Sequence, residues 1–168
     1  MPLIKLLLDL CLFRRGPQDI PLSRFLLVLT LAFSLLASIL LSWLEVGFFQ
    51  AILQSVGATL LLAGFLFVML RLANKVARFP QTVIAALAAD GLVTVVAIPL
   101  VLISLSFPEW QATVSLLLMA MMLWELAVLG YIIQQAMGFP RYGIGLGLAF
   151  VYTVLSMRIM MELFSPLS

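Results

Sequence analysis

The sequence contains five long apolar stretches, and the stretch from Gln81 to Ser106 constrains the fold most. A helix rises about 1.5 Å per residue, so this stretch reaches roughly 39 Å and exceeds the hydrocarbon core of a bilayer, which is about 30 Å thick. Asp90 is the one side chain in the stretch that can carry a charge. An ionised carboxylate at mid-membrane costs at least about 2.5–3.5 kcal/mol, so the fold must pair, protonate or hydrate Asp90.

Composition supports a membrane protein. Hydrophobic residues make up 65% of the 168 residues and charged residues 10%, with a mean hydropathy of +1.26. A soluble domain of this length would expose far more polar surface. We therefore expect an all-α integral membrane bundle of five transmembrane helices in one membrane domain, residues 22–168. The expected spans cover residues 22–44, 48–70, 81–106, 111–137 and 143–164.

Residues 1–21 form a separate N-terminal segment in this interpretation. Its apolar run of about 12 residues is too short to span a bilayer. Lys5 and Asp9 interrupt the run and share one helix face, as expected of a short amphipathic interfacial helix. Arg14 and Arg15 would then contact lipid headgroups. A buried helix packed beneath the bundle is an open alternative.

Basic residues are concentrated at alternate ends of the expected spans. The second and fourth connections, and the segment up to the start of the first span, hold eight of the nine Lys and Arg: Lys5, Arg14, Arg15, Arg24, Arg71, Lys75, Arg78 and Arg141. The other two connections carry Glu45 and Glu109. The positive-inside rule therefore predicts a cytoplasmic N-terminus and a periplasmic C-terminus in a bacterial inner membrane.

Small residues recur at every fourth position in three of the spans. Such stripes let helix backbones approach closely, and their hydroxyls can bond across the interface. We expect the first two spans to form an antiparallel hairpin packed through their stripes, although the residues could simply be tolerated in lipid. The candidate packing residues are Ser34, Ser38 and Ser42, then Ala51, Ser55, Thr59 and Ala63, and in the fifth span Gly143 with Gly147 and Gly145 with Ala149.

Glu125 is a second carboxylate inside an apolar span. By helical rise it lies roughly 21 Å from the outer end of the fourth span, near the expected depth of Asp90. A short turn joins the third and fourth spans, so the two carboxyls can face each other, in which case at least one is neutral at pH 7. Arg158 in the fifth span is expected to pair with Glu162, one turn further on, while a bridge to Asp90 requires that span to shift or tilt.

The residue types exclude several functional classes. The chain has no histidine, and its single cysteine, Cys11, has no partner for a disulfide or a CxxC motif. Ser-His pairs and HExxH motifs are likewise absent from the sequence. We therefore expect no enzymatic activity, no metal, no cofactor and no nucleic-acid partner.

The segment from Gly16 to Pro21, GPQDIP, leads directly into five closely spaced spans. This arrangement resembles the small five-span proteins of the Yip1 type. The resemblance implies a membrane organiser or adaptor that binds other membrane proteins or shapes lipid, and it carries no site residues. We accordingly expect a non-enzymatic accessory or assembly subunit, with the lipid bilayer and other membrane proteins, or further copies of the chain, as partners.

The alternative function is a small proton- or cation-coupled carrier or channel that uses Asp90 and Glu125. Intramembrane carboxylates often mark proton relays or cation sites. Thr94, Gln134 and Gln135 are the polar residues expected nearby. In the alternative in which the carboxylates are structural, each is protonated or bonded to a neighbouring group and fixes the helix register.

Overall fold

The computed structural model describes residues 16–21 and 23–164, and the expected interfacial helix with Arg14 and Arg15 lies outside them. The described part is helical and contains no strand. Its five long helices are α2 (Arg24–Trp43), α3 (Phe48–Leu72), α4 (Phe79–Ser106), α5 (Gln111–Met137) and α6 (Tyr142–Phe164). By length and composition each is able to cross a membrane, which confirms the expected all-α bundle of five apolar helices.

Local sequence signals set the helix ends. Ser23 caps α2, since its side chain accepts a hydrogen bond from the Leu26 amide at 3.4 Å. Pro80 stands in the first turn of α4, where an amide has no helical partner, and α4 begins at Phe79, two residues before the expected start. Gly138 ends α5 in the left-handed conformation, with φ of 66°. Three short 3₁₀ turns complete the chain: η1 (Pro17–Asp19), η2 (Val76–Arg78) and η3 (Pro108–Trp110).

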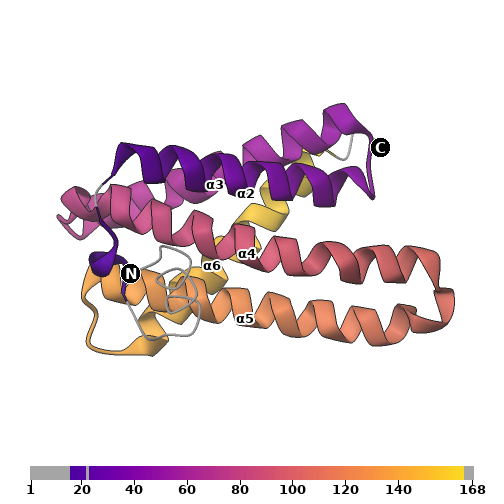
Figure 1. Ribbon diagram of the computed structural model, residues 1–168. Coiled ribbons are helices and arrows are strands. Elements are labelled where there is room, and N and C mark those ends of the chain that lie inside the picture. Colours follow the sequence, from indigo (N-terminus) through magenta and orange to yellow (C-terminus); the bar gives the residue numbers. More distant parts are fainter. Residues whose placement is uncertain (1–15, 22, 165–168) are drawn as a thin grey trace.

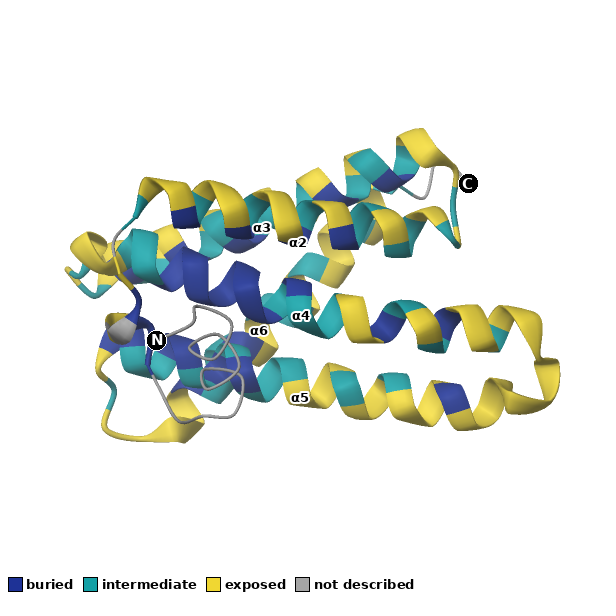
Figure 2. Ribbon diagram, in the orientation of Figure 1, coloured by how far each residue is buried: buried dark blue, intermediate teal, exposed yellow. Residues whose placement is uncertain are grey.

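Helix α4 lies at the centre of the bundle. Helices α2 and α3 lie on one side of α4 and α5 on the other, while α6 crosses from α5 towards α3 (Figure 1). Residues 82–89 of α4 are all buried, and four of them are alanines, which let the neighbouring helices approach closely. Beyond Pro99, most residues of α4 and the facing half of α5 are exposed (Figure 2). In a bilayer their apolar side chains would contact lipid tails.

One end of the bundle is held by basic side chains. Lys75 donates a hydrogen bond from Nζ to the carbonyl of Met137 at 2.5 Å, and Arg78 donates from Nη1 to the carbonyl of Ala136 at 3.2 Å. These carbonyls belong to the last turn of α5, where no helical amide remains to bond them. We call this end, formed by residues 73–78 and 138–141, the basic end.

Helices α5 and α6 cross closely at two glycines. A Cβ added at Gly145 would overlap the carbonyl oxygen of Gly130, and one added at Gly130 would lie 2.9 Å from the Cα of Leu146. Gly145 and Ala149 are both buried, whereas Gly143 and Gly147 are exposed and a Cβ on either would meet nothing within 4 Å. The fifth span therefore packs on α5 through the second of the two expected pairs, Gly145 with Ala149.

This crossing predicts opposite effects for two glycines on the same helix. Gly145→Ala should destabilise the folded protein by about 1–3 kcal/mol, because the methyl group overlaps α5 backbone. Gly147→Ala, the matched control, should leave stability unchanged or raise it by up to about 1 kcal/mol through helix propensity. Thermal unfolding in detergent measures both, and equal melting temperatures for the two variants would contradict the crossing.

Candidate functional site: a carboxylate pair within the bundle

Asp90 on α4 and Glu125 on α5 line the same small cavity, as the sequence suggested they could. The cavity has a volume of about 50 Å³, and we call it the Glu125 cavity. Each water molecule needs about 10–15 Å³ of water-accessible volume, so the cavity has room for about three to five. Its other walls come from Leu62, Ala86, Ala89, Leu129, Ile132 and Tyr152.

The two carboxylates lie at similar heights in their helices. By helical rise Asp90 is about 16 Å from Phe79, the first residue of α4. Glu125 is about 18 Å from Met137, the last residue of α5, which lies at the same end of the bundle. Both positions fall near the middle of a hydrocarbon core about 30 Å thick.

Asp90 is held by a serine from α2. The hydroxyl of Ser34 donates a hydrogen bond to Oδ2 of Asp90 at 2.5 Å, and Ser34 itself is buried. Gly91 permits this contact, since a Cβ there would lie 2.7 Å from the ring of Phe33 and 3.2 Å from the Cα of Ser34. Ser34, expected as a packing residue, is therefore also a hydrogen-bond donor to the carboxylate.

A second cavity of about 50 Å³ adjoins Asp90 on the side of α2 and α3. We call it the Ser38 cavity. Ser38 and Thr59, from the two small-residue stripes, line it together with Asp90 and Tyr152. Elsewhere on the α3 stripe, Ala51 and Ser55 are buried and Ala63 is half-buried. The stripes thus supply polar groups around Asp90 as well as space for packing.

Tyr152 on α6 is a site residue that sequence reasoning missed. It lines both the Ser38 cavity and the Glu125 cavity, and its ring packs against Phe65 of α3 with the centroids 5.1 Å apart. It follows Ala149 by one helical turn and so shares the face of α6 that packs into the bundle. This spacing from Ala149 is the sequence feature that could have identified Tyr152 as a residue facing the bundle interior.

The other expected polar residues take different places. Arg158 and Glu162 lie at exposed positions on α6, and their pairing stays a prediction. Asp90 accepts a hydrogen bond from the hydroxyl of Ser34 rather than pairing with Arg158. Gln134 donates to the carbonyl of Phe139 near the basic end at 3.4 Å. Neither Gln134 nor Gln135 lines the cavities around Asp90.

Comparisons with known proteins found no relative, so the class of this protein is argued from its structure. No family model matches the chain, and no curated protein or solved structure matches it. In the described part of the chain, no group of three or more His, Cys, Asp or Glu could hold a metal ion. The fold and the site define a multi-pass helical membrane protein with two carboxylates facing one interior cavity.

The Ser34–Asp90 hydrogen bond predicts energetic coupling between α2 and α4. Ser34→Ala should destabilise the protein by about 1–3 kcal/mol, because it removes the donor to a buried carboxyl. In an Asp90→Leu background the same change should cost much less, since the partner is already absent. Ser115→Ala is the control, because that hydroxyl bonds only to the carbonyl of Gln111 on its own helix. The free energy of unfolding in detergent is measured for each variant. Additive effects of Ser34→Ala and Asp90→Leu would contradict the contact.

Proposed function

We propose that the protein binds a proton or a small monovalent cation between Asp90 and Glu125 and moves it across the membrane. One observation carries the proposal: both carboxylates line a single cavity in the interior of an apolar bundle. The other described residues that line this cavity are apolar, apart from Tyr152, and none is basic.

The charge balance of the Glu125 cavity supports this function. Two ionised carboxylates that share a poorly hydrated cavity repel each other and each lose hydration. A proton or a monovalent cation bound between them removes most of the repulsion and lowers the net charge of the cavity from −2 to −1. A site of this kind gains its charge partner from solution rather than from the protein, which is the property that an ion-coupled membrane protein requires.

Proton flux in reconstituted vesicles tests the proposal. Protein in liposomes with an internal pH-sensitive dye should acidify the lumen when the outside is acidified and valinomycin with potassium clamps the potential. Asp90→Asn and Glu125→Gln should each lower the rate at least tenfold, because each removes an exchangeable charge from the cavity. Glu162→Gln is the matched control, since it neutralises an exposed carboxylate, and it should retain the rate.

Repeating the assay with sodium or potassium gradients separates a cation from a proton. Unchanged flux of every ion tested in Asp90→Asn would rule out a role for the pair in transport. Variants are compared only when their size-exclusion profiles in detergent match that of the unmodified protein.

A second candidate function, an accessory or assembly subunit, is favoured by the outer part of the α4–α5 hairpin. Here α4 and α5 run beside each other away from α2 and α3 (Figure 1). The large apolar side chains exposed on α5 in this region include Leu116, Leu117, Met119, Met122, Leu123 and Trp124. A second membrane protein or a second copy could cover them. Under this function Asp90→Asn would leave insertion and partner binding intact.

The orientation proposed for the chain places the basic end in the cytoplasm of a bacterial cell. Support comes from Arg71, Lys75, Arg78 and Arg141, which lie in or beside the α3–α4 and α5–α6 connections at one end of the bundle, as the positive-inside rule requires. The N-terminus would then be cytoplasmic and the C-terminus periplasmic.

Thiol labelling tests this orientation. In a Cys11→Ser background, Ala77→Cys at the basic end and Glu109→Cys at the opposite end both introduce exposed thiols. A membrane-impermeant maleimide should label the cysteine at 109 in intact spheroplasts and the cysteine at 77 only in inverted vesicles. The reverse pattern would place the basic end outside the cytoplasm.

A further inference from the structure

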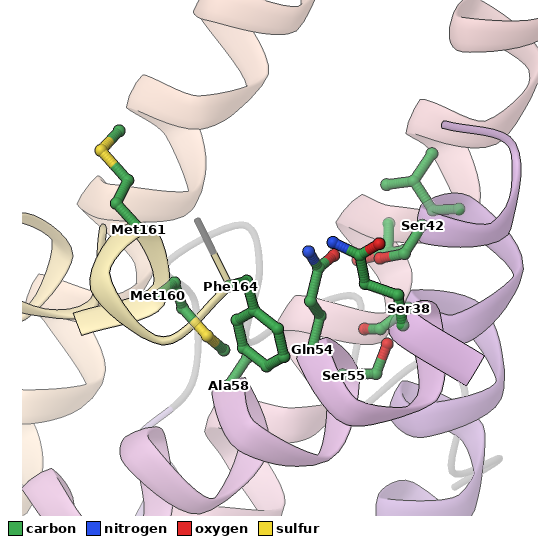
Figure 3. A pocket seen from close by; sticks show the side chains of 11 residues that line it. Ser38, Ser42, Gln54, Ser55, Ala58, Met160, Met161 and Phe164 are labelled. Carbon is green, nitrogen blue, oxygen red and sulfur yellow. The ribbon is translucent and has the colours of Figure 1, made fainter. Parts of the chain in front are cut away.

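A large vestibule opens between α2, α3, α4 and the last turns of α6. Its volume is about 770 Å³. Figure 3 shows Ser38, Gln54 and Ser55 on one side of it, with Met160 and Phe164 of α6 across from them. The polar side chains of its wall come from three helices: Ser38, Ser42, Gln50, Gln54, Ser55 and Thr94.

Ser55 is a wall residue of the vestibule whose buried hydroxyl lacks a partner among the described residues. Its side chain is 3% exposed, and its Oγ has no hydrogen-bond partner in the described part of the chain. Leaving a buried hydroxyl unbonded costs about 1–3 kcal/mol, and buried polar groups of this kind are usually bonded to protein or to ordered water. Ser55 lines the vestibule, but its Oγ is buried, so a change of side-chain rotamer is needed before water in the vestibule can supply the missing partner.

The vestibule adjoins the carboxylate site, since neighbouring cavities share wall residues. Ser38 and Ala58 line both the vestibule and the Ser38 cavity. Asp90 and Tyr152 line both the Ser38 cavity and the Glu125 cavity. The order from the vestibule inward is therefore Ser38, Asp90 with Tyr152, and Glu125.

In contrast to the vestibule, the basic end of the bundle is packed closed. Between Asp90 and that end, residues 82–89 of α4 are buried against a core that includes Leu66, Leu70 and Ile133. Lys75 and Arg78 tie the α3–α4 link to the end of α5. The two sides of Asp90 thus differ, with polar cavities on one and packed apolar side chains on the other.

We propose that water fills the vestibule and reaches Asp90 from the end of the bundle opposite the basic end. Asp90, through the Ser38 cavity, then meets the entering proton or hydrated cation first, and Glu125 lies behind it. The inference rests on the proposed function for the role of Asp90 and deepens it by naming the side from which the site is loaded. The polar groups along the vestibule are neutral hydroxyls and amides, which can hydrogen-bond water and small hydrated cations.

Cysteine accessibility tests the water route without reference to transport. The variants Gln54→Cys and Ser38→Cys are made in the Cys11→Ser background and treated in sealed vesicles with an impermeant cationic methanethiosulfonate. Both thiols should react at least tenfold faster than their matched controls, Leu53→Cys and Leu40→Cys, which are exposed on the lipid side of the same helices. Thiols in hydrocarbon stay protonated and react slowly, because the thiolate is the nucleophile.

The side of access is read by treating intact spheroplasts and inverted vesicles separately. The cysteines at 54 and 38 should react from the side on which Glu109→Cys reacts, and Ala85→Cys, beyond Asp90, should stay unreactive from both sides. If the cysteines at 54 and 38 are as slow as their controls, lipid fills the vestibule and the inference is wrong. Reaction only from the basic side also overturns it. Fast reaction with no ion flux refutes the proposed transport and leaves the water route standing.

Discussion

The close approach of α2 to α4 at Gly91 is the contact on which the site depends. Because Gly91 has no side chain, Phe33 and Ser34 fit directly against α4, and the Ser34 hydroxyl reaches Asp90. A carboxyl in the membrane interior without such a partner costs several kcal/mol. The hydrogen bond therefore fixes the register of the two helices, since a shift of one residue would turn Ser34 away and leave Asp90 unbonded.

Much of the fold follows from local sequence. Five apolar runs, separated by Pro and Gly and by charged links, define the five long helices. The face that each helix buries is harder to predict from the sequence. Gly143 with Gly147 and Gly145 with Ala149 have identical spacing, and only the path of α6 across α5 selects the second pair. Lys75 and Arg78 were expected only as topology signals, yet they also bond the last carbonyls of α5.

The part of the site that lies on spans adjacent in sequence could be predicted. Asp90 and Glu125 have matching depths on helices joined by a short turn, so helix geometry places them at one level and allows them to face each other. Ser34 and Tyr152 come from helices that are not sequence neighbours of α4. Their positions depend on how α2 and α6 pack across the bundle, and a periodic pattern along one helix carries no information about its partner. For Arg158 the sequence favoured Glu162 over Asp90 as a partner, and Arg158 lies at an exposed position on α6.

Transport by such a site requires that access alternate between the two ends, and the packing of α6 offers a physical means. The first turns of α6 are fixed to α5 by the Gly130–Gly145 crossing and by the Tyr142 hydroxyl, which donates to the carbonyl of Ala127 at 2.7 Å. Further along, a groove of about 290 Å³ separates α6 from α3, and Tyr152 lines it as well as both small cavities. A pivot at the tight crossing would move Tyr152 relative to Asp90 and Glu125 while leaving the basic end in place. Rigid-body movement of one helix about a packed contact needs little rearrangement of side chains elsewhere. If the proposed transport holds, the asymmetry between this tight crossing and the groove beside the far half of α6 favours α6, rather than the buried half of α4, as the element that changes access to the carboxylates.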